Sequence, residues 1–247
     1  MLRSGTATLQ GHFVEIGRLS RAPWSVTFFA PQSIRGDVKR WLDTNHASLS
    51  EAFARARKVL DAAFPFNVGR TFEVYLIPAG KTYEHRWTSI VFREQDVRLH
   101  FAFYLPATLT GDDRDWSARL FGFLSHEYSH SYFWFHPQWF RNNYSDEVIA
   151  WSIQRCVQTA IAGRQDETPQ DGFAQAYANA KSMSPAAVFA RYHAEYPETY
   201  AANIAAEGLF RRAVSAETAA TTISGLPDLC RTIVSSGVDF TSAREDR

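Results

Sequence analysis

Residues 116–130 read Trp-Ser-Ala-Arg-Leu-Phe-Gly-Phe-Leu-Ser-His-Glu-Tyr-Ser-His, and the last five of them carry the most information in the chain. In an α-helix, residues four apart lie on the same face, one turn from each other. His126 and His130 can therefore both reach one metal ion. Glu127 can then take a proton from a water molecule bound to that ion. The pentad predicts a zinc site.

The residues around the pentad predict the helix that this site requires. Apolar side chains recur at three- and four-residue spacing over residues 116–124, and no proline occurs over residues 107–136. Three aspartates within residues 112–115 lie where negative charge stabilises the start of a helix. Gly122, one turn before His126, has no side chain to crowd the site. The alternative is an ordinary amphipathic helix with two core histidines, which leaves the intervening glutamate unexplained.

A zinc site of this kind needs a third protein ligand and leaves one position to water. Glu147 begins a second predicted helical stretch, residues 145–156, and an antiparallel arrangement would place its carboxylate opposite the two histidines. His136 is the alternative, because its spacing from His130 is that of a three-histidine site. That geometry needs a sharp turn at a glycine three residues after the second histidine, where this chain has Phe133. We expect Glu147 to be the third ligand.

The pentad, followed after sixteen residues by Glu147, resembles the gluzincin group of zinc metallopeptidases, which includes thermolysin-like and aminopeptidase N-like enzymes. The resemblance covers about residues 96–160. It implies a zincin-like α+β fold, a Zn²⁺ cofactor and cleavage of a peptide or protein substrate by a zinc-activated water, with Glu127 as general base. Trp151 is a departure, because thermolysin-like enzymes carry there an aspartate that supports a histidine. The alternatives are a zincin-like metal-binding protein without turnover and a hydrolase of non-peptide amides.

A second hydrogen-bond donor usually helps to stabilise the oxyanion that forms during such a reaction. Residues 191–200 offer several tyrosines and one histidine, from which we take His193 and Tyr200 as the candidates. The same cluster is also typical of aromatic side chains that pack between helices.

Residues 97–105 alternate as a strand that ends at Pro106. The resemblance suggests that this is an edge strand, to which an extended peptide substrate can pair through its main chain. The alternative is an interior strand with both edges paired. His100 is interpreted as a residue on the face of this strand rather than a metal ligand.

Composition narrows the function classes. Lys plus Arg and Asp plus Glu number 26 each, so nothing indicates a nucleic acid or an anionic membrane as partner. No membrane span and no signal peptide is recognised, which predicts a cytoplasmic protein as the sequence is written, or a periplasmic or secreted one if a leader has been removed. Cys156 is interpreted as a small buried hydrophobe, and a disulfide with Cys230 is left open.

At 247 residues the chain can bury a large core. We predict one zincin-like domain, with an α+β lobe at about residues 1–135, a helical lobe at about residues 136–240, and the zinc site in the cleft between them. One long helix is predicted over residues 37–64, with a break near Asn45. Strands are predicted over residues 6–17, 24–30, 71–77, 89–93 and 97–105, the last two as a hairpin.

Overall fold

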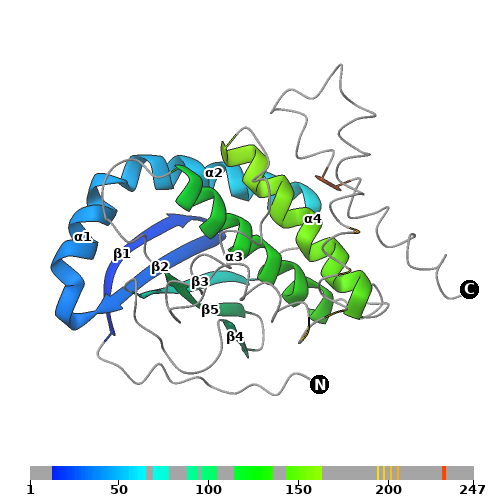
Figure 1. Ribbon diagram of the computed structural model, residues 1–247, viewed down its shortest axis with the longest axis horizontal. Coiled ribbons are helices and arrows are strands. Elements are labelled where there is room, and N and C mark those ends of the chain that lie inside the picture. The colour runs from blue at the N-terminus through cyan, green and yellow to red at the C-terminus, as the bar shows by residue number, and fades with distance from the viewer. Residues whose placement is uncertain are drawn as a thin grey trace, which may run out of the picture.

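The computed structural model describes residues 13–64, 69–77, 88–93, 96–104, 114–135, 143–162, 194, 197, 201, 205 and 230–231. Helices and strands are mixed along the chain, which confirms the α+β class (Figure 1). The elements are, in order, β1 (Phe13–Arg21), β2 (Trp24–Pro31), the short 3₁₀ helix η1 (Gln32–Ile34), α1 (Arg35–Thr44), α2 (His46–Ala63), β3 (Gly69–Ile77), β4 (Thr88–Arg93), β5 (Asp96–Tyr104), α3 (Arg114–Phe135) and α4 (Asn143–Ala162).

The five strands form one mixed sheet in the order β1-β2-β3-β5-β4. β2, β3 and β5 are parallel, while β1 and β4 run antiparallel to their neighbours. The predicted hairpin is confirmed, because β4 and β5 pair from Arg93 opposite Asp96 onward. His100 lies within β5, in register with Glu73 of β3 and Ser89 of β4.

The prediction that residues 97–105 form an edge strand is wrong. β5 lies between β3 and β4, and among the described strands it is β4 that has a neighbour on one side only at this end of the sheet. The physical reason lies outside the strand itself. A short connection folds β4 back along one edge of β5, and a long-range parallel pairing with β3 occupies the other edge.

The first strand ends later than predicted, at Arg21, and residues 6–12 of the predicted strand lie outside the described part of the chain. Gly17 does not end β1, because the register shifts between Glu15 and Gly17 and the pairing with β2 continues to Arg21. A bulge of this kind absorbs one extra residue without ending the strand. A Cβ atom at Gly17 would lie 2.6 Å from Cδ2 of Leu42, so this glycine lets α1 approach the sheet.

The break predicted near Asn45 is confirmed, since it separates α1 from α2. The buried Asn45 side chain donates from Nδ2 to the carbonyl oxygen of Trp41 at 2.9 Å, and the Asn45 backbone N–H donates to the same oxygen at 3.0 Å. A side chain that bonds the backbone of the preceding turn in this way competes with continuation of the helix.

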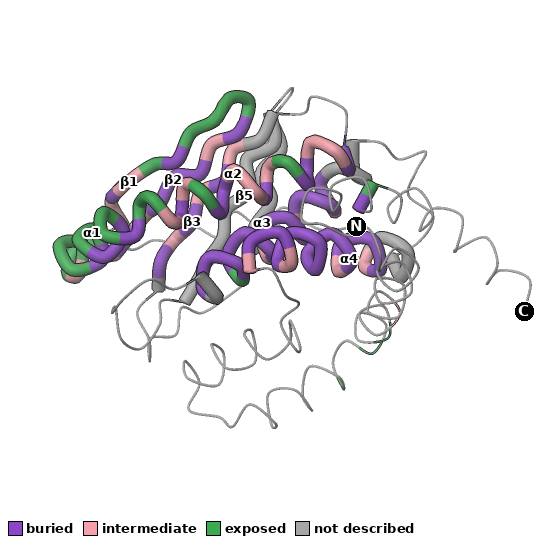
Figure 2. Tube along the Cα trace, turned by 90° about the horizontal axis from the view of Figure 1, so that it is seen from above, coloured by how far each residue is buried: buried purple, intermediate pink, exposed green. Residues whose placement is uncertain are grey.

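The core lies between one face of the sheet and the helices. Alternate residues of β2 and β3 are buried on this face, namely Trp24, Val26, Phe28, Ala30, Phe72, Val74 and Leu76. The indole N–H of Trp24 donates to Asp61 of α2 at 2.9 Å, and its ring lies 4.8 Å from that of Tyr128 of α3. Figure 2 shows that α3 and α4 are buried along much of their length.

Helices α3 and α4 are antiparallel neighbours. Residues near the end of α3 meet the start of α4, as the contact of His130 with Glu147 shows, while Gly122 in the first half of α3 meets Gln158 near the end of α4. A Cβ atom at Gly122 would lie 2.7 Å from Cγ of Gln158. The missing side chain therefore lets the two helices approach closely, and it does so away from the histidines.

Cys156 of α4 is buried, as expected, but it is bonded to Cys230, so the disulfide left open by the sequence is present. Most of the predicted helical lobe lies outside the described residues, and the division into two lobes stays a prediction. None of the described helices is both long enough and apolar enough to cross a bilayer.

Candidate metal centre

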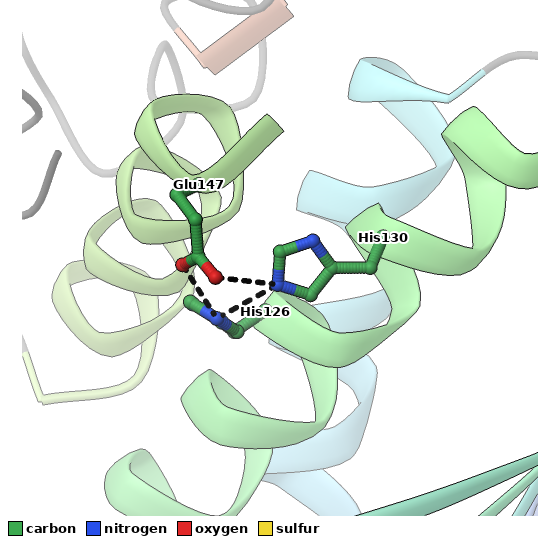
Figure 3. A group of neighbouring side chains, drawn as sticks. All are labelled: His126, His130 and Glu147. Atoms are coloured by element: carbon green, nitrogen blue, oxygen red, sulfur yellow. Dashed lines mark hydrogen bonds and ion pairs between the residues drawn. The ribbon is translucent and has the colours of Figure 1, made fainter. Parts of the chain in front are cut away.

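Three side chains from α3 and α4 converge on one point (Figure 3). The Nε2 atoms of His126 and His130 are 3.1 Å apart. Oε2 of Glu147 lies 3.6 Å from Nε2 of His126, and Oε1 of Glu147 lies 3.8 Å from Nε2 of His130. The structure therefore brings together the three residues that the sequence singled out as metal ligands.

The donor atoms have the chemistry and spacing that a divalent metal ion requires. Two imidazole nitrogens and a carboxylate are a usual set of protein ligands for zinc, with metal–ligand bonds of about 2.0–2.2 Å. Such bonds at tetrahedral angles put donor atoms about 3.3–3.5 Å apart, close to the observed 3.1, 3.6 and 3.8 Å. An ion would need only small side-chain adjustments to bind.

The site is largely buried, with a partly exposed rim. The side chain of His126 keeps 7% of its surface exposed, against 17% for His130 and 22% for Glu147. Three protein ligands would leave the fourth position of a tetrahedral zinc ion to a further ligand such as water.

Tyr128, in the middle of the pentad, attaches this helix to the sheet. Two residues from His126 and two from His130, it lies on the far side of α3 from both. Its buried ring lies 4.8 Å from the ring of Trp24 and 5.6 Å from that of Phe64. Packing of Tyr128 against the core thus turns the two histidines toward α4.

Small residues, Gly122 among them, line one face of α3. Ala118, Gly122, Ser125 and Ser129 recur at helical spacing and are all buried. The hydroxyls of Ser125 and Ser129 donate to the carbonyl oxygens four residues earlier, at 2.6 and 2.8 Å. These buried hydroxyls are thus satisfied within α3, and the face stays narrow enough for α4 to pack against it.

Burial keeps His126 neutral. Burial lowers its pKa well below the ordinary value of 6.5, and the nearby positive charges of His130 and Arg155 lower it further. A neutral imidazole has a free lone pair, which metal binding requires. At pH 7 His126 is therefore ready to bind a cation without first losing a proton.

The remaining predicted site residues are placed only in part. Glu127 lies on α3 between the two histidines and is partly buried. α3 continues as a helix through Phe133 to Phe135, so the backbone lacks the sharp turn that a three-histidine site requires. His136, His193 and Tyr200 lie outside the described residues, and their roles stay predictions.

Trp151 contacts the site. From the sequence alone, this residue was recognised only as a departure from the gluzincin pattern. Its ring centroid lies 4.5 Å from that of His126, with the planes at 68°. The signal for this contact was present in the sequence, because Trp151 follows Glu147 by four residues and so shares its helix face.

No protein-family model, no curated protein and no solved structure matches this chain. The case for a function therefore depends on the geometry of the site and on the motif.

Proposed function

We propose that the protein is a zinc-dependent hydrolase with a zincin-like fold, most simply a metallopeptidase similar to the gluzincins. The observation that carries this proposal is the convergence of His126, His130 and Glu147, whose ligand atoms all lie within 4.8 Å of one another. This arrangement combines the His-Glu-x-x-His pentad with a glutamate from the following helix, as the resemblance to gluzincins implies.

The residues of the site divide the chemistry between them. His126 and His130 would hold the metal through Nε2, and the carboxylate of Glu147 would complete the protein ligands. Zinc bound there would supply a more acidic water and polarisation of a substrate carbonyl. The carboxylate of Glu127 accepts the proton of the attacking water and passes it to the leaving nitrogen.

An edge strand is consistent with a peptide as the substrate. β4 lies at the edge of the described sheet, next to β5, and precedes α3 in the chain. An extended peptide can add to such an edge through main-chain hydrogen bonds. We therefore propose β4, rather than residues 97–105, as the strand to which a peptide substrate pairs.

Metal content is the first test, measured by elemental analysis on wild type and on His126→Ala. We expect about one zinc per chain in wild type and little in the variant. His46→Ala is the matched control, because His46 is an exposed histidine at the start of α2 and should leave the metal content unchanged. Wild type that takes up no zinc would refute the proposed metal centre.

Hydrolysis of peptide substrates is the second test. Glu127→Gln should retain zinc and lose turnover, because the amide cannot accept the proton of water. Turnover unchanged in Glu127→Gln would refute this mechanism, and zinc binding without turnover in wild type would identify a metal-binding protein instead.

A further inference from the structure

Helix α4 presents two residues to the metal helix in successive turns. Glu147 approaches Nε2 of both histidines, and Trp151, four residues later, packs against the ring of His126 with centroids 4.5 Å apart. The interplanar angle of 68° makes this an edge-to-face contact, a preferred geometry for aromatic rings. The same face of α4 therefore supplies a ligand and an aromatic contact to another ligand.

Among the described residues, the second ring nitrogen of His126 has no hydrogen-bond partner of the kind that metal-binding histidines usually have. Nε2 faces His130 and Glu147, while Nδ1 is buried and meets no hydrogen-bond acceptor in the described part of the chain. In most metal sites this nitrogen donates to a carboxylate, a carbonyl or a water, and that bond fixes the orientation of the ring. Among the described residues, a packing contact is therefore the candidate for fixing the ring of His126.

We infer that the indole of Trp151 fixes the ring of His126 by packing, in place of a hydrogen-bond acceptor on Nδ1. Trp151 is then a positioning residue, and this inference rests on the proposed metal centre. The indole is itself held by packing, since its Nε1 is buried and has no acceptor within the described ranges. Rotation of the imidazole away from His130 and Glu147 would require the large, rigid indole to move.

This arrangement differs chemically from support by a carboxylate. A carboxylate on Nδ1 would fix the ring and also make the imidazole more basic, whereas an indole fixes the ring without adding negative charge. The contribution of Trp151 to metal affinity should therefore depend on the presence of an aromatic plane and not on hydrogen bonding.

Two substitutions separate these effects. Trp151→Phe keeps an aromatic plane, and Trp151→Leu removes it. The control is Trp41→Leu in α1. Trp41 makes an edge contact with Trp116 at 4.7 Å and, like Trp151, has a buried Nε1 atom without an acceptor among the described residues. Zinc affinity is measured by competition with a chromophoric chelator, on proteins whose folding is verified by circular dichroism.

We expect Trp151→Leu to weaken zinc binding by about 10- to 100-fold, the usual effect of losing the support of a ligand histidine. Trp151→Phe should retain most of the affinity, and Trp41→Leu should match wild type. The inference would be overturned if Trp151→Leu bound zinc with the same affinity as wild type. An equal loss in the Phe and Leu variants would also overturn it, because the aromatic plane is what positions the imidazole.

A measurement on the metal-free protein separates this inference from the metal centre itself. Side-chain NMR should show one χ1 and χ2 rotamer for His126, with nuclear Overhauser contacts between its imidazole protons and the indole of Trp151. Averaged rotamers in wild type would overturn the inference, whether or not zinc binds. Wild type that holds one rotamer but takes up no zinc would refute the metal centre alone. If Trp151→Leu does not fold, Trp151→Phe and the rotamer measurement decide.

Discussion

Gly122→Ala adds one methyl group where α3 packs closely against α4. The new Cβ would lie 2.7 Å from Cγ of Gln158 and 3.2 Å from its Cδ and Nε2. Gln158 is buried, with 2% of its surface exposed, so it has little room to withdraw. Overpacking of this kind costs about 1–3 kcal/mol, whereas Ala in place of Gly in a helix gains about 0.5–1 kcal/mol. We expect a net loss of about 0–2.5 kcal/mol in the free energy of unfolding.

Denaturant unfolding of four proteins measures the contact directly. Wild type, Gly122→Ala, Gln158→Ala and the double variant form a cycle, in which shortening Gln158 should relieve the clash and give a coupling of about 1–3 kcal/mol. Gly36→Ala in α1 is the matched control, because a Cβ atom there would meet nothing within 4 Å and only the gain in helix propensity remains. The close packing of the two helices would be refuted if Gly122→Ala stabilised the protein as much as Gly36→Ala and showed no coupling to Gln158.

Three further predictions concern the disulfide, the buried histidine and the tyrosine of the pentad. Cys156→Ser should lower the free energy of unfolding by about 4 kcal/mol, the loop-closure value for a separation of 74 residues, and Cys230→Ser should lower it equally. As a check, a reductant should lower the free energy of unfolding of wild type and leave that of both variants unchanged. Because the pKa of His126 is lowered below 6.5, its contribution to stability is present above pH 6.5 and is lost as the pH falls. Below pH 6.5, the free energy of unfolding of the metal-free protein should fall by at most about 1.4 kcal/mol per pH unit. Urea titrations at several pH values measure this dependence, which His126→Gln should remove and His46→Gln should leave unchanged. Tyr128→Ala should lower the free energy of unfolding by about 3–5 kcal/mol and weaken zinc binding, whereas Tyr128→Phe should have a much smaller effect on both. Unchanged zinc binding in a folded Tyr128→Ala variant would show that this ring does not orient the histidines.

The local features of the fold could be predicted from the sequence, and the long-range ones could not. The helix that carries the pentad, the break at Asn45 and the hairpin of β4 and β5 each depend on residues close together in the chain. The pairing of β5 with β3 joins strands about 27 residues apart, and nothing in either strand specifies it. The sequence therefore predicted β5 as a strand, while the resemblance to gluzincins suggested an edge position and the alternative of an interior strand is the one observed.

In the candidate site too, local features could be predicted from the sequence and long-range ones could not. His126 and His130 are brought together by helix geometry alone, so their spacing predicts their proximity. Glu147 required one tertiary assumption, an antiparallel α4, which the short segment between the two helices favours. Trp151 required a second, since its contact with His126 depends on the rotation of α4 about its own axis.

That rotation is determined by residues on both sides of the interface. Glu147, Trp151 and Gln158 recur at helical spacing along α4, and their partners His126 and Gly122 recur along α3 in the reverse order. A turn of α4 about its axis would withdraw the Glu147 carboxylate from the histidines and the indole from His126 together. Close packing at Gly122 opposes that turn at a point on the interface away from the metal ligands. The geometry of the candidate site is therefore maintained by the helix interface as a whole, and a variant such as Gly122→Ala tests the proposed metal centre without touching any of its proposed ligands.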